Sequence, residues 1–144
     1  MKKFFLIMVA IIGFGVSANA QYKYYISTGR FVFSDGSSTT GHSGAKGEYR
    51  NDPQYTDVKG GPIPVGTYYI TNVKNDLNGS YHLNVIVLSP DSGNNMYGRY
   101  DFRIHGDNTD STASQGCIIL SREHRQKIAD DFDKNGRRTL TVYE

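Results

Sequence analysis

The sequence has no run of basic residues and almost no net charge. Its 16 lysines and arginines stand against 14 aspartates and glutamates. Two of those lysines, Lys2 and Lys3, lie in the first 20 residues, so the remaining chain carries 14 charges of each sign. Binding to a phosphate backbone needs a cluster of basic side chains. Nucleic acid is therefore excluded as an expected partner.

The sequence also lacks an apolar run long enough to span a membrane. Its longest run extends from residue 4 to residue 16, whereas a spanning helix needs about 20 apolar residues. Two lysines precede this run and Ala18-Asn19-Ala20 follows it, which is the layout of a cleavable secretory signal peptide. We predict a signal peptide over 1–20, cleavage after Ala20, and a single domain over 21–144. The expected location is periplasmic or secreted, with no stable membrane anchor after cleavage; an uncleaved anchor is the alternative.

Cysteine is almost absent, because Cys117 is the only one in the chain. Exported domains commonly use cysteines in pairs, which an oxidising compartment joins as disulfides. A single cysteine cannot form an internal disulfide. Cys117 is therefore a buried small side chain, half of an intermolecular disulfide, or a reactive thiol.

Short alternating patterns predict a mainly β domain with one helix near the C-terminus. The segments 23–27 and 30–34 flank Thr28-Gly29, which has the composition of a two-residue hairpin turn. A helix is predicted from the cap residue Ser121 to Asn135-Gly136. Further strands are predicted over 67–73, 81–89, 99–105 and 138–144.

A long polar and glycine-rich segment, residues 35–66, separates the first two strands from the others. It shows little periodicity, and loops of this length are more often functional than idle. Pro62 and Pro64 exclude a central strand at its end. We hypothesise that the segment is a lid over a cleft. Hydrogen exchange that is equal with and without bound peptide would count against a lid.

The pattern RYDFRIH, residues 99–105, presents polar side chains on one face of a strand. Alternation places Arg103 and His105 on one side and Phe102 and Ile104 on the other. If the apolar pair faces the core, the arginine and the histidine lie together on the accessible face. A solvated strand face has the same pattern, but this arrangement is also suited to acid–base chemistry.

The segment Ser114-Gln115-Gly116-Cys117 adds a nucleophile to this histidine. Glycine lets the backbone turn sharply before the thiol, and the amides around Cys117 can donate to an oxyanion. The apolar residues 118–120 follow, so the thiol is expected at the mouth of a buried strand. A neighbouring imidazole such as His105 is one way to generate a thiolate at neutral pH. Together these groups are the minimal equipment for acyl transfer.

The histidines show no recognised metal-ligand spacing, so we expect no metal site. Acyl transfer by a cysteine and a histidine requires no organic cofactor, so none is expected.

These residues resemble a known family. HG at 105–106, followed by S-x-G-C-I at 114–118, is similar to the signature of the L,D-transpeptidase catalytic domain. Upstream, HSG at 42–44, NDPQY at 51–55 and GPIPVGTYYI at 61–70 resemble more narrowly the small L,D-transpeptidase-like domain of type VI secretion effectors that target peptidoglycan. The similarity runs in order from about Tyr22 to the C-terminus.

The resemblance implies an L,D-transpeptidase-like β-sandwich and assigns roles to four residues. Cys117 matches the nucleophile and His105 matches the base. Ser114 and Gly116 match the positions that shape the nucleophile turn and its oxyanion site, although Gln115 stands where the motif usually has histidine or asparagine.

A second departure concerns the substrate carboxylate. The larger family commonly has arginine two residues after the cysteine, where this chain has Ile119. Recognition of the carboxylate is therefore expected to fall to Arg103, Arg99 or Arg122. His42, in the upstream motif, is a further candidate for contact with substrate.

The implied reaction is a cysteine acyl exchange on peptidoglycan stem tetrapeptides, at the bond between the diamino acid and the terminal D-alanine. The sequence is compatible with water, a free D-amino acid or a second stem peptide as the acceptor, and with an immunity protein as a partner. Type VI effectors typically have no cleavable signal, so this chain is expected to be a self-exported envelope enzyme.

Two other classes of protein compete with the enzyme as interpretations of the sequence. The alternative is a non-catalytic envelope module that binds wall peptides, and a secreted cysteine protease has no support beyond the dyad. A binding module has no physical reason to keep a free thiol exposed to oxidation, which favours the enzyme.

Overall fold

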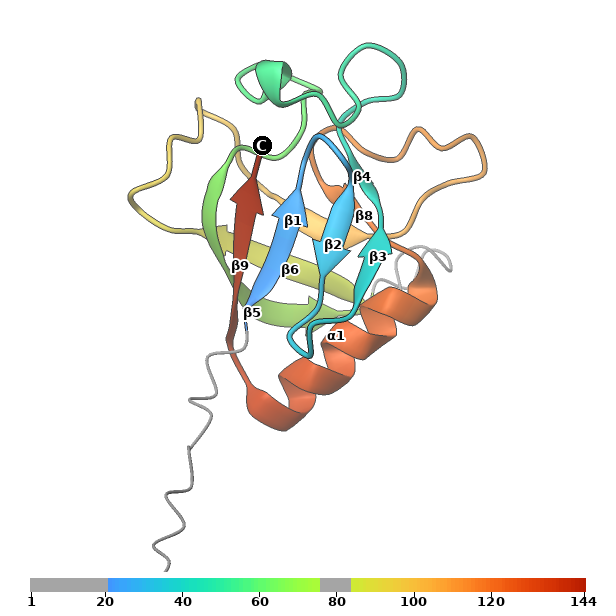
Figure 1. Ribbon diagram of the computed structural model, residues 1–144, viewed down its shortest axis with the longest axis vertical. Coiled ribbons are helices and arrows are strands. Elements are labelled where there is room, and N and C mark those ends of the chain that lie inside the picture. Colours follow the sequence, from blue (N-terminus) through green and yellow to red (C-terminus); the bar gives the residue numbers. More distant parts are fainter. Residues whose placement is uncertain (1–20, 76–83) are drawn as a thin grey trace, which may run out of the picture.

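The computed structural model describes residues 21–75 and 84–144, so the predicted signal peptide and residues 81–83 of a predicted strand lie outside the described residues. The described residues form nine strands, one short 3₁₀ helix and one α-helix (Figure 1). These elements are β1 (Tyr22–Tyr25), β2 (Arg30–Val32), β3 (Ser38–Thr40), β4 (His42–Ser43), η1 (Pro53–Tyr55), β5 (Gly66–Lys74), β6 (Val85–Pro90), β7 (Arg103–His105), β8 (Ile118–Ile119), α1 (Arg122–Asn135) and β9 (Arg138–Tyr143).

The nine strands belong to one sheet, in the order β3-β2-β1-β9-β5-β6-β7-β8-β4. Its edge strands, β3 and β4, are separated in sequence by Gly41 alone, so the sheet has to curl until its edges approach each other. In Figure 1, β1, β2, β3 and β9 form a layer in front of β5 and β6. The mainly β fold with one helix near the C-terminus is confirmed, and the layers of the predicted sandwich belong to a single, nearly closed sheet.

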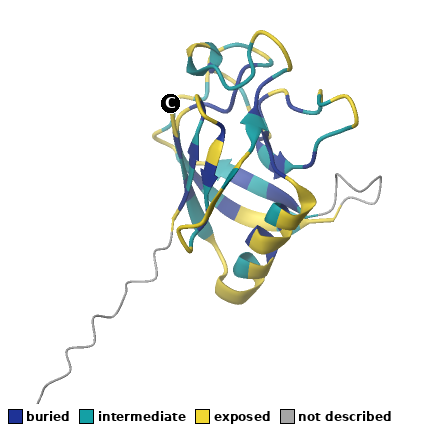
Figure 2. Cartoon of the chain, turned by 45° about the vertical axis from the view of Figure 1, so that its right-hand side comes forward, coloured by how far each residue is buried: buried dark blue, intermediate teal, exposed yellow. Residues whose placement is uncertain are grey.

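The core lies inside this curled sheet. Aromatic residues such as Tyr24 and Phe31 fill it from the β1–β2 side, and isoleucines such as Ile86 and Ile104 fill it from the β6–β7 side. Figure 2 shows buried residues along the strands and exposed residues on the outer face of α1. Ile128 is the fully buried apolar residue with which α1 contributes to the core.

The ends of α1 are those that the sequence predicts. Ser121 caps the helix by accepting a hydrogen bond from the backbone N–H of His124, and Gly136 follows the last turn with a φ of 74°. No helix among the described residues is long and apolar enough to cross a membrane.

Three details differ from the sequence-based predictions. The β1–β2 hairpin is present, but its register pairs Tyr25 with Arg30, which leaves a four-residue loop instead of a two-residue turn. The strand predicted over 99–105 is shortened to β7, because Asp101 has a φ of 64°, which is incompatible with an extended strand.

The largest difference concerns residues 35–66, which were expected to be a loop. Strand β3 pairs with β2, and β4 pairs with β8, so part of this segment completes the sheet. Sequence patterning misses both strands because they are only two or three residues long and polar. A lid made of the whole segment is therefore not what the structure shows.

Candidate active site

The pairing of two short strands brings the predicted catalytic residues to one place. Strands β7 and β8 are parallel, with Ile104 opposite Ile118 and His105 opposite Ile119. Both central isoleucines are fully buried, so the alternating residues of β7 face the other way. Cys117, directly before β8, lines the same hollow as His105. This hollow, about 180 Å³ in volume, is also lined by Val85, Asp101 and Arg103.

His105 is held in a defined orientation by the backbone of the next residue, Gly106. Its Nδ1 lies 2.7 Å from the carbonyl oxygen of Gly106. A carbonyl only accepts hydrogen bonds, so Nδ1 carries the proton and Nε2 is the basic nitrogen. The HG pair of the sequence therefore fixes the tautomer that a general base requires.

The environment of Cys117 favours a neutral thiol. Burial raises the pKa of this thiol, and the charge of Asp101 acts in the same direction. A backbone hydrogen bond from Arg103 and the positive charges of Arg103 and Arg99 oppose the increase in pKa but do not outweigh it. Burial therefore opposes the resting thiolate that the sequence pattern suggested, and the proton has to be removed when the thiol reacts.

We expect the labelling rate of Cys117 by iodoacetamide to keep rising as the pH is raised beyond about 8.5, the pKa of an unperturbed thiol. The reason is that only the thiolate reacts, and burial keeps its fraction low until the pH exceeds the raised pKa. Because Cys117 is the only cysteine, total label incorporation reports on it alone. The urea-unfolded chain is the control for an ordinary thiol, and a rate that is already constant at neutral pH would contradict the expectation.

Ser114 and Gly116 shape the turn that presents Cys117. The buried hydroxyl of Ser114 donates to the carbonyl oxygen of Cys117 at 2.6 Å and accepts from the backbone N–H of Gly44 at 3.0 Å and of Gly116 at 3.2 Å. Gly116 has a φ of 128°, which non-glycine residues rarely adopt. Because the N–H of Gly116 already donates to Ser114, the N–H of Cys117 is the better candidate for an oxyanion donor.

Ser43, which the residue-by-residue reading of the sequence did not select, supports the same turn from β4. Its fully buried hydroxyl donates to the carbonyl oxygen of Gly116 at 2.8 Å and accepts from the N–H of Ile63 at 2.9 Å. The only sequence signal for it was its place in the upstream HSG motif. Ser43 and Ser114 hold the turn from two sides.

Arg99 holds several backbone segments together near this turn through hydrogen bonds. Its guanidinium donates to the carbonyl oxygens of Pro62 at 2.7 Å, Gly61 at 2.7 Å and Gln115 at 3.3 Å, and also to that of Thr56 at 2.5 Å. These bonds join the GPIP segment to the residue before Gly116. With its donors used in this way, Arg99 is less available for a substrate carboxylate than its position in the sequence suggested.

The other two arginines lie in different places. Arg103 lines the Cys117–His105 hollow and forms a salt bridge with Asp101. Arg122, the first residue of α1, lies instead in a separate hollow of about 380 Å³ whose lining does not include Cys117. Of the three candidates for carboxylate recognition, the structure therefore brings Arg103 to both His105 and Cys117.

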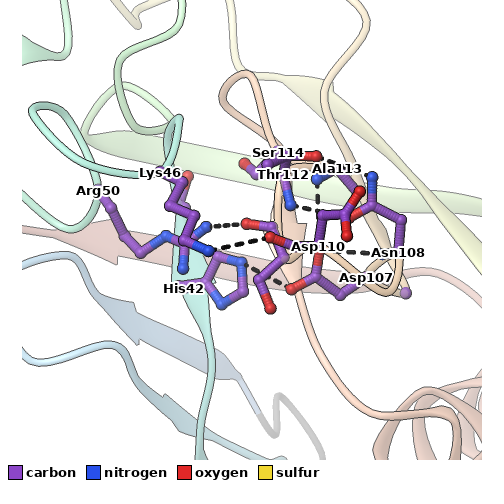
Figure 3. Close-up of polar contacts among 12 residues, drawn as sticks. His42, Lys46, Arg50, Asp107, Asn108, Asp110, Thr112, Ala113 and Ser114 are labelled. Carbon is purple, nitrogen blue, oxygen red and sulfur yellow. Dashed lines mark hydrogen bonds and ion pairs between the residues drawn. The ribbon is translucent and has the colours of Figure 1, made fainter.

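His42 also lies outside the Cys117 hollow, opposite Ile119 on the far side of β8. Its Nε2 is 3.3 Å from Oδ2 of Asp107, in the geometry of an ion pair without a hydrogen bond (Figure 3). Burial and the charge of Arg50 lower the pKa of His42, whereas Asp107 raises it. His42 is therefore placed to stabilise the segment after His105 and is separated from the thiol.

A polar network fixes the segment 107–114, which connects the histidine to the 114–117 turn (Figure 3). Oδ1 of Asp107 accepts from the N–H groups of Asn108 at 3.0 Å and Ala113 at 3.3 Å. From the 42–50 segment, Lys46 donates to the carbonyl oxygen of Asp110 at 3.1 Å, and Arg50 donates to that of Ser111. The hydrogen bonds of Asp107 join the two ends of the segment, and those of Lys46 and Arg50 attach the segment to the chain that follows β4.

Within residues 21–75 and 84–144 there is no group of three or more His, Cys, Asp or Glu side chains that could hold a metal ion. The Cys117–His105 hollow offers a thiol, an imidazole, a guanidinium, the carboxylate of Asp101 and backbone amides.

Comparison with known proteins identifies the family and the fold. A search of curated protein sequences finds no match. Among solved structures, the chain is similar to L,D-transpeptidase 1 of Mycobacterium tuberculosis, with a TM-score of 0.51 and 17% sequence identity, over 88% of this chain and 60% of that one. The likeness is one of fold, and the chain spans less than two thirds of that protein. The family model of the Tlde1 domain matches residues 37–143. The chain belongs to the Tlde1-domain family and has an L,D-transpeptidase-like fold.

Proposed function

We propose that this protein is an envelope cysteine acyl transferase or hydrolase that acts on peptidoglycan stem tetrapeptides, at the bond between the diamino acid and the terminal D-alanine. The observation that carries the proposal is the position of Cys117 and His105 in one hollow, in a chain with an L,D-transpeptidase-like fold. The sequence layout of residues 1–20 supports export to the compartment that contains this substrate.

The first step is attack by the Cys117 sulfur on the carbonyl carbon. His105 Nε2 takes the thiol proton as the C–S bond forms, because Nδ1 is held as a donor to Gly106. The carbonyl electrons move to the oxygen, which the N–H of Cys117 stabilises. Loss of one such donor typically costs about 10²- to 10³-fold in rate.

The second step releases the amino acid. The tetrahedral intermediate collapses, the C–N bond breaks, and the His105 imidazolium returns its proton to the leaving amine nitrogen. The thioester on Cys117 is then attacked by water or by another amine, with His105 again removing the proton. No oxidant, reductant or metal enters this balance.

The alternative, a module that only binds wall peptides, is less well supported. Such a module requires neither the defined tautomer of His105 nor two buried serines that hold the turn before the thiol. These features are useful when a nucleophile has to be positioned for reaction.

The test is to incubate the chain 21–144 with purified muropeptide tetrapeptides and to identify products by mass spectrometry. Loss or exchange of the terminal D-alanine is expected. Replacement of His105 by alanine should lower the rate by roughly 10²- to 10⁴-fold, because it removes the general base. His124→Ala, in α1 and outside the hollow, is the matched control and should keep the activity. Unchanged tetrapeptide with the folded wild-type protein would favour the binding module.

A further inference from the structure

Cys117 lines two hollows of different size. The smaller one, of about 180 Å³, contains His105 and Arg103. The larger one, of about 630 Å³, includes Lys59, Tyr100 and Gln115 in its lining. Cys117 and Asp101 line both, so the two hollows meet at these two residues. A substrate that reacts with Cys117 therefore has two directions in which to extend.

We propose that the smaller hollow is the subsite for the leaving and incoming α-amino acid, that Arg103 binds its carboxylate, and that the stem peptide extends into the larger hollow. This inference rests on the proposed function, since it assigns the two sides of the same bond. It adds a direction of binding and a specificity-determining residue.

The position of His105 decides the direction. The base that takes the thiol proton has to return it to the leaving nitrogen, which requires that nitrogen within hydrogen-bond reach of the imidazole. His105 lines the smaller hollow and is not part of the lining of the larger one. The leaving amine, and by reversibility an incoming amine, therefore lies on the smaller side.

The volume of the smaller hollow agrees with a single small amino acid. The terminal D-alanine is the smaller of the two groups that the scissile bond joins, and the hollow of about 180 Å³ is the smaller of the two that Cys117 lines. The larger hollow has more than three times this volume, as an extended peptide requires.

Arg103 is prepared to bind a carboxylate. Its Nε and Nη2 donate to Oδ1 of Asp101 at 2.9 and 2.8 Å, and Nη2 also donates to Oδ2 at 2.9 Å. This geometry is the fork-to-carboxylate pairing that arginine forms with ligands. The side chains of Arg103 and Asp101 are 41% and 59% exposed, and such exposed pairs contribute little stability. A substrate carboxylate can therefore replace that of Asp101 at low cost.

The backbone conformation of Asp101 explains why its carboxylate pairs with the guanidinium of Arg103. Its φ of 64° places it in the left-handed region, which ends the extended backbone before β7, and its carbonyl oxygen lies 3.8 Å from the Cys117 sulfur. The residue is thus held between the nucleophile and the arginine. Its carboxylate stands where, on this proposal, the carboxylate of D-alanine would bind.

The experiment compares two donors, a tetrapeptide with a free terminal carboxylate and the same tetrapeptide with a terminal carboxamide. For the wild-type protein we expect kcat/KM to be roughly 10- to 100-fold higher for the carboxylate, as for a lost charged hydrogen bond. In Arg103→Gln this ratio should fall close to one, because only the carboxylate substrate loses a partner. In Asp101→Asn, KM for the carboxylate substrate should decrease.

Lys59→Gln, in the larger hollow, is the matched control and should leave the carboxylate-to-carboxamide ratio unchanged. A structural effect of Arg103→Gln would lower both rates equally, so an unchanged ratio would overturn the inference. Release of D-alanine by the wild type with no preference between the donors would also overturn it while leaving the proposed function intact. No release at all would instead remove the proposed function.

Additional arms identify the source of the incoming amino acid. Labelled D-alanine, D-phenylalanine and a second tetrapeptide are offered as acceptors in separate reactions. We expect D-alanine to be incorporated faster than D-phenylalanine, and Arg103→Gln to remove this incorporation. Equal incorporation of both would contradict the size argument. A cross-linked dimer whose formation depends on Arg103 would identify a second stem peptide as the source of the incoming amine. Arg103 would then bind the α-amino acid head group of that peptide's diamino acid.

Discussion

Replacement of Cys117 by alanine is expected to reduce the release of D-alanine by about 10⁴-fold or more while leaving the fold intact. No other cysteine is present to take over the attack. The thiol donates one weak hydrogen bond, to the carbonyl of Asp101 at 3.8 Å, accepts one from the backbone of Arg103, and lies at a surface hollow. Its truncation should therefore change the free energy of unfolding by less than about 1 kcal/mol. Steady-state rates and thermal unfolding measure the two effects.

Cys117→Ser tests whether the chemistry of sulfur, and not only the shape of the side chain, is required. The hydroxyl is nearly isosteric but a much weaker nucleophile, so this variant should bind tetrapeptide without turning it over at a comparable rate. Wild-type activity in Cys117→Ala would show that the reaction does not pass through a thioester. The proposal of a cysteine acyl transferase would then be abandoned.

Replacement of Gly116 by alanine is expected to lower both stability and activity. An added Cβ would lie 2.4 Å from Nη2 of Arg99, 2.9 Å from Cε1 of Phe102 and 3.1 Å from the carbonyl oxygen of Gly61. The φ of 128° adds backbone strain of about 1–3 kcal/mol, and the crowding adds a similar amount. We expect the melting temperature to fall by roughly 8–24 °C, at about 4 °C per kcal/mol for a domain of this size.

The activity of Gly116→Ala should fall by about 10²-fold or more, since a displacement of about 1 Å of the reacting groups has such an effect. Gly47→Ala is the matched control. Its φ is 98°, but an added Cβ there has no neighbour within 4 Å. It should show a smaller loss of stability, from backbone strain alone, and normal activity. Equal effects of the two substitutions would mean that the contacts with Arg99 and Phe102 are unimportant.

Some parts of this site were predictable because they depend on local pattern. Alternation alone placed Phe102 and Ile104 in the core and left Arg103 and His105 on the other face, as the structure confirms. The cap at Ser121 and the end of the helix at Gly136 also follow from single residues. These features require no knowledge of what the chain packs against.

Other parts were not predictable, because they depend on residues far apart in the sequence. Ser43 supports Gly116 across 73 residues, and Arg99 joins Gly61 to Gln115. Strands β3 and β4 have no periodicity of their own and exist because they complete the edges of a curled sheet. Long-range hydrogen bonds of this kind leave no short-range signal in composition or spacing.

The sequence by itself determined the fold class, the limits of the helix, and the pair of residues, Cys117 and His105, on which the chemistry is proposed to depend. Tertiary structure alone decided which arginine meets that pair. Arg99, Arg103 and Arg122 are equivalent as residue types, but their surroundings differ. Arg99 donates to the backbone of Gln115, Arg103 lies on β7, whose register against β8 brings it to the pair, and Arg122 begins α1. The parallel pairing of β7 and β8 decides which of their side chains lie on the same face of the sheet. The curl of the sheet then decides which hollow those side chains line.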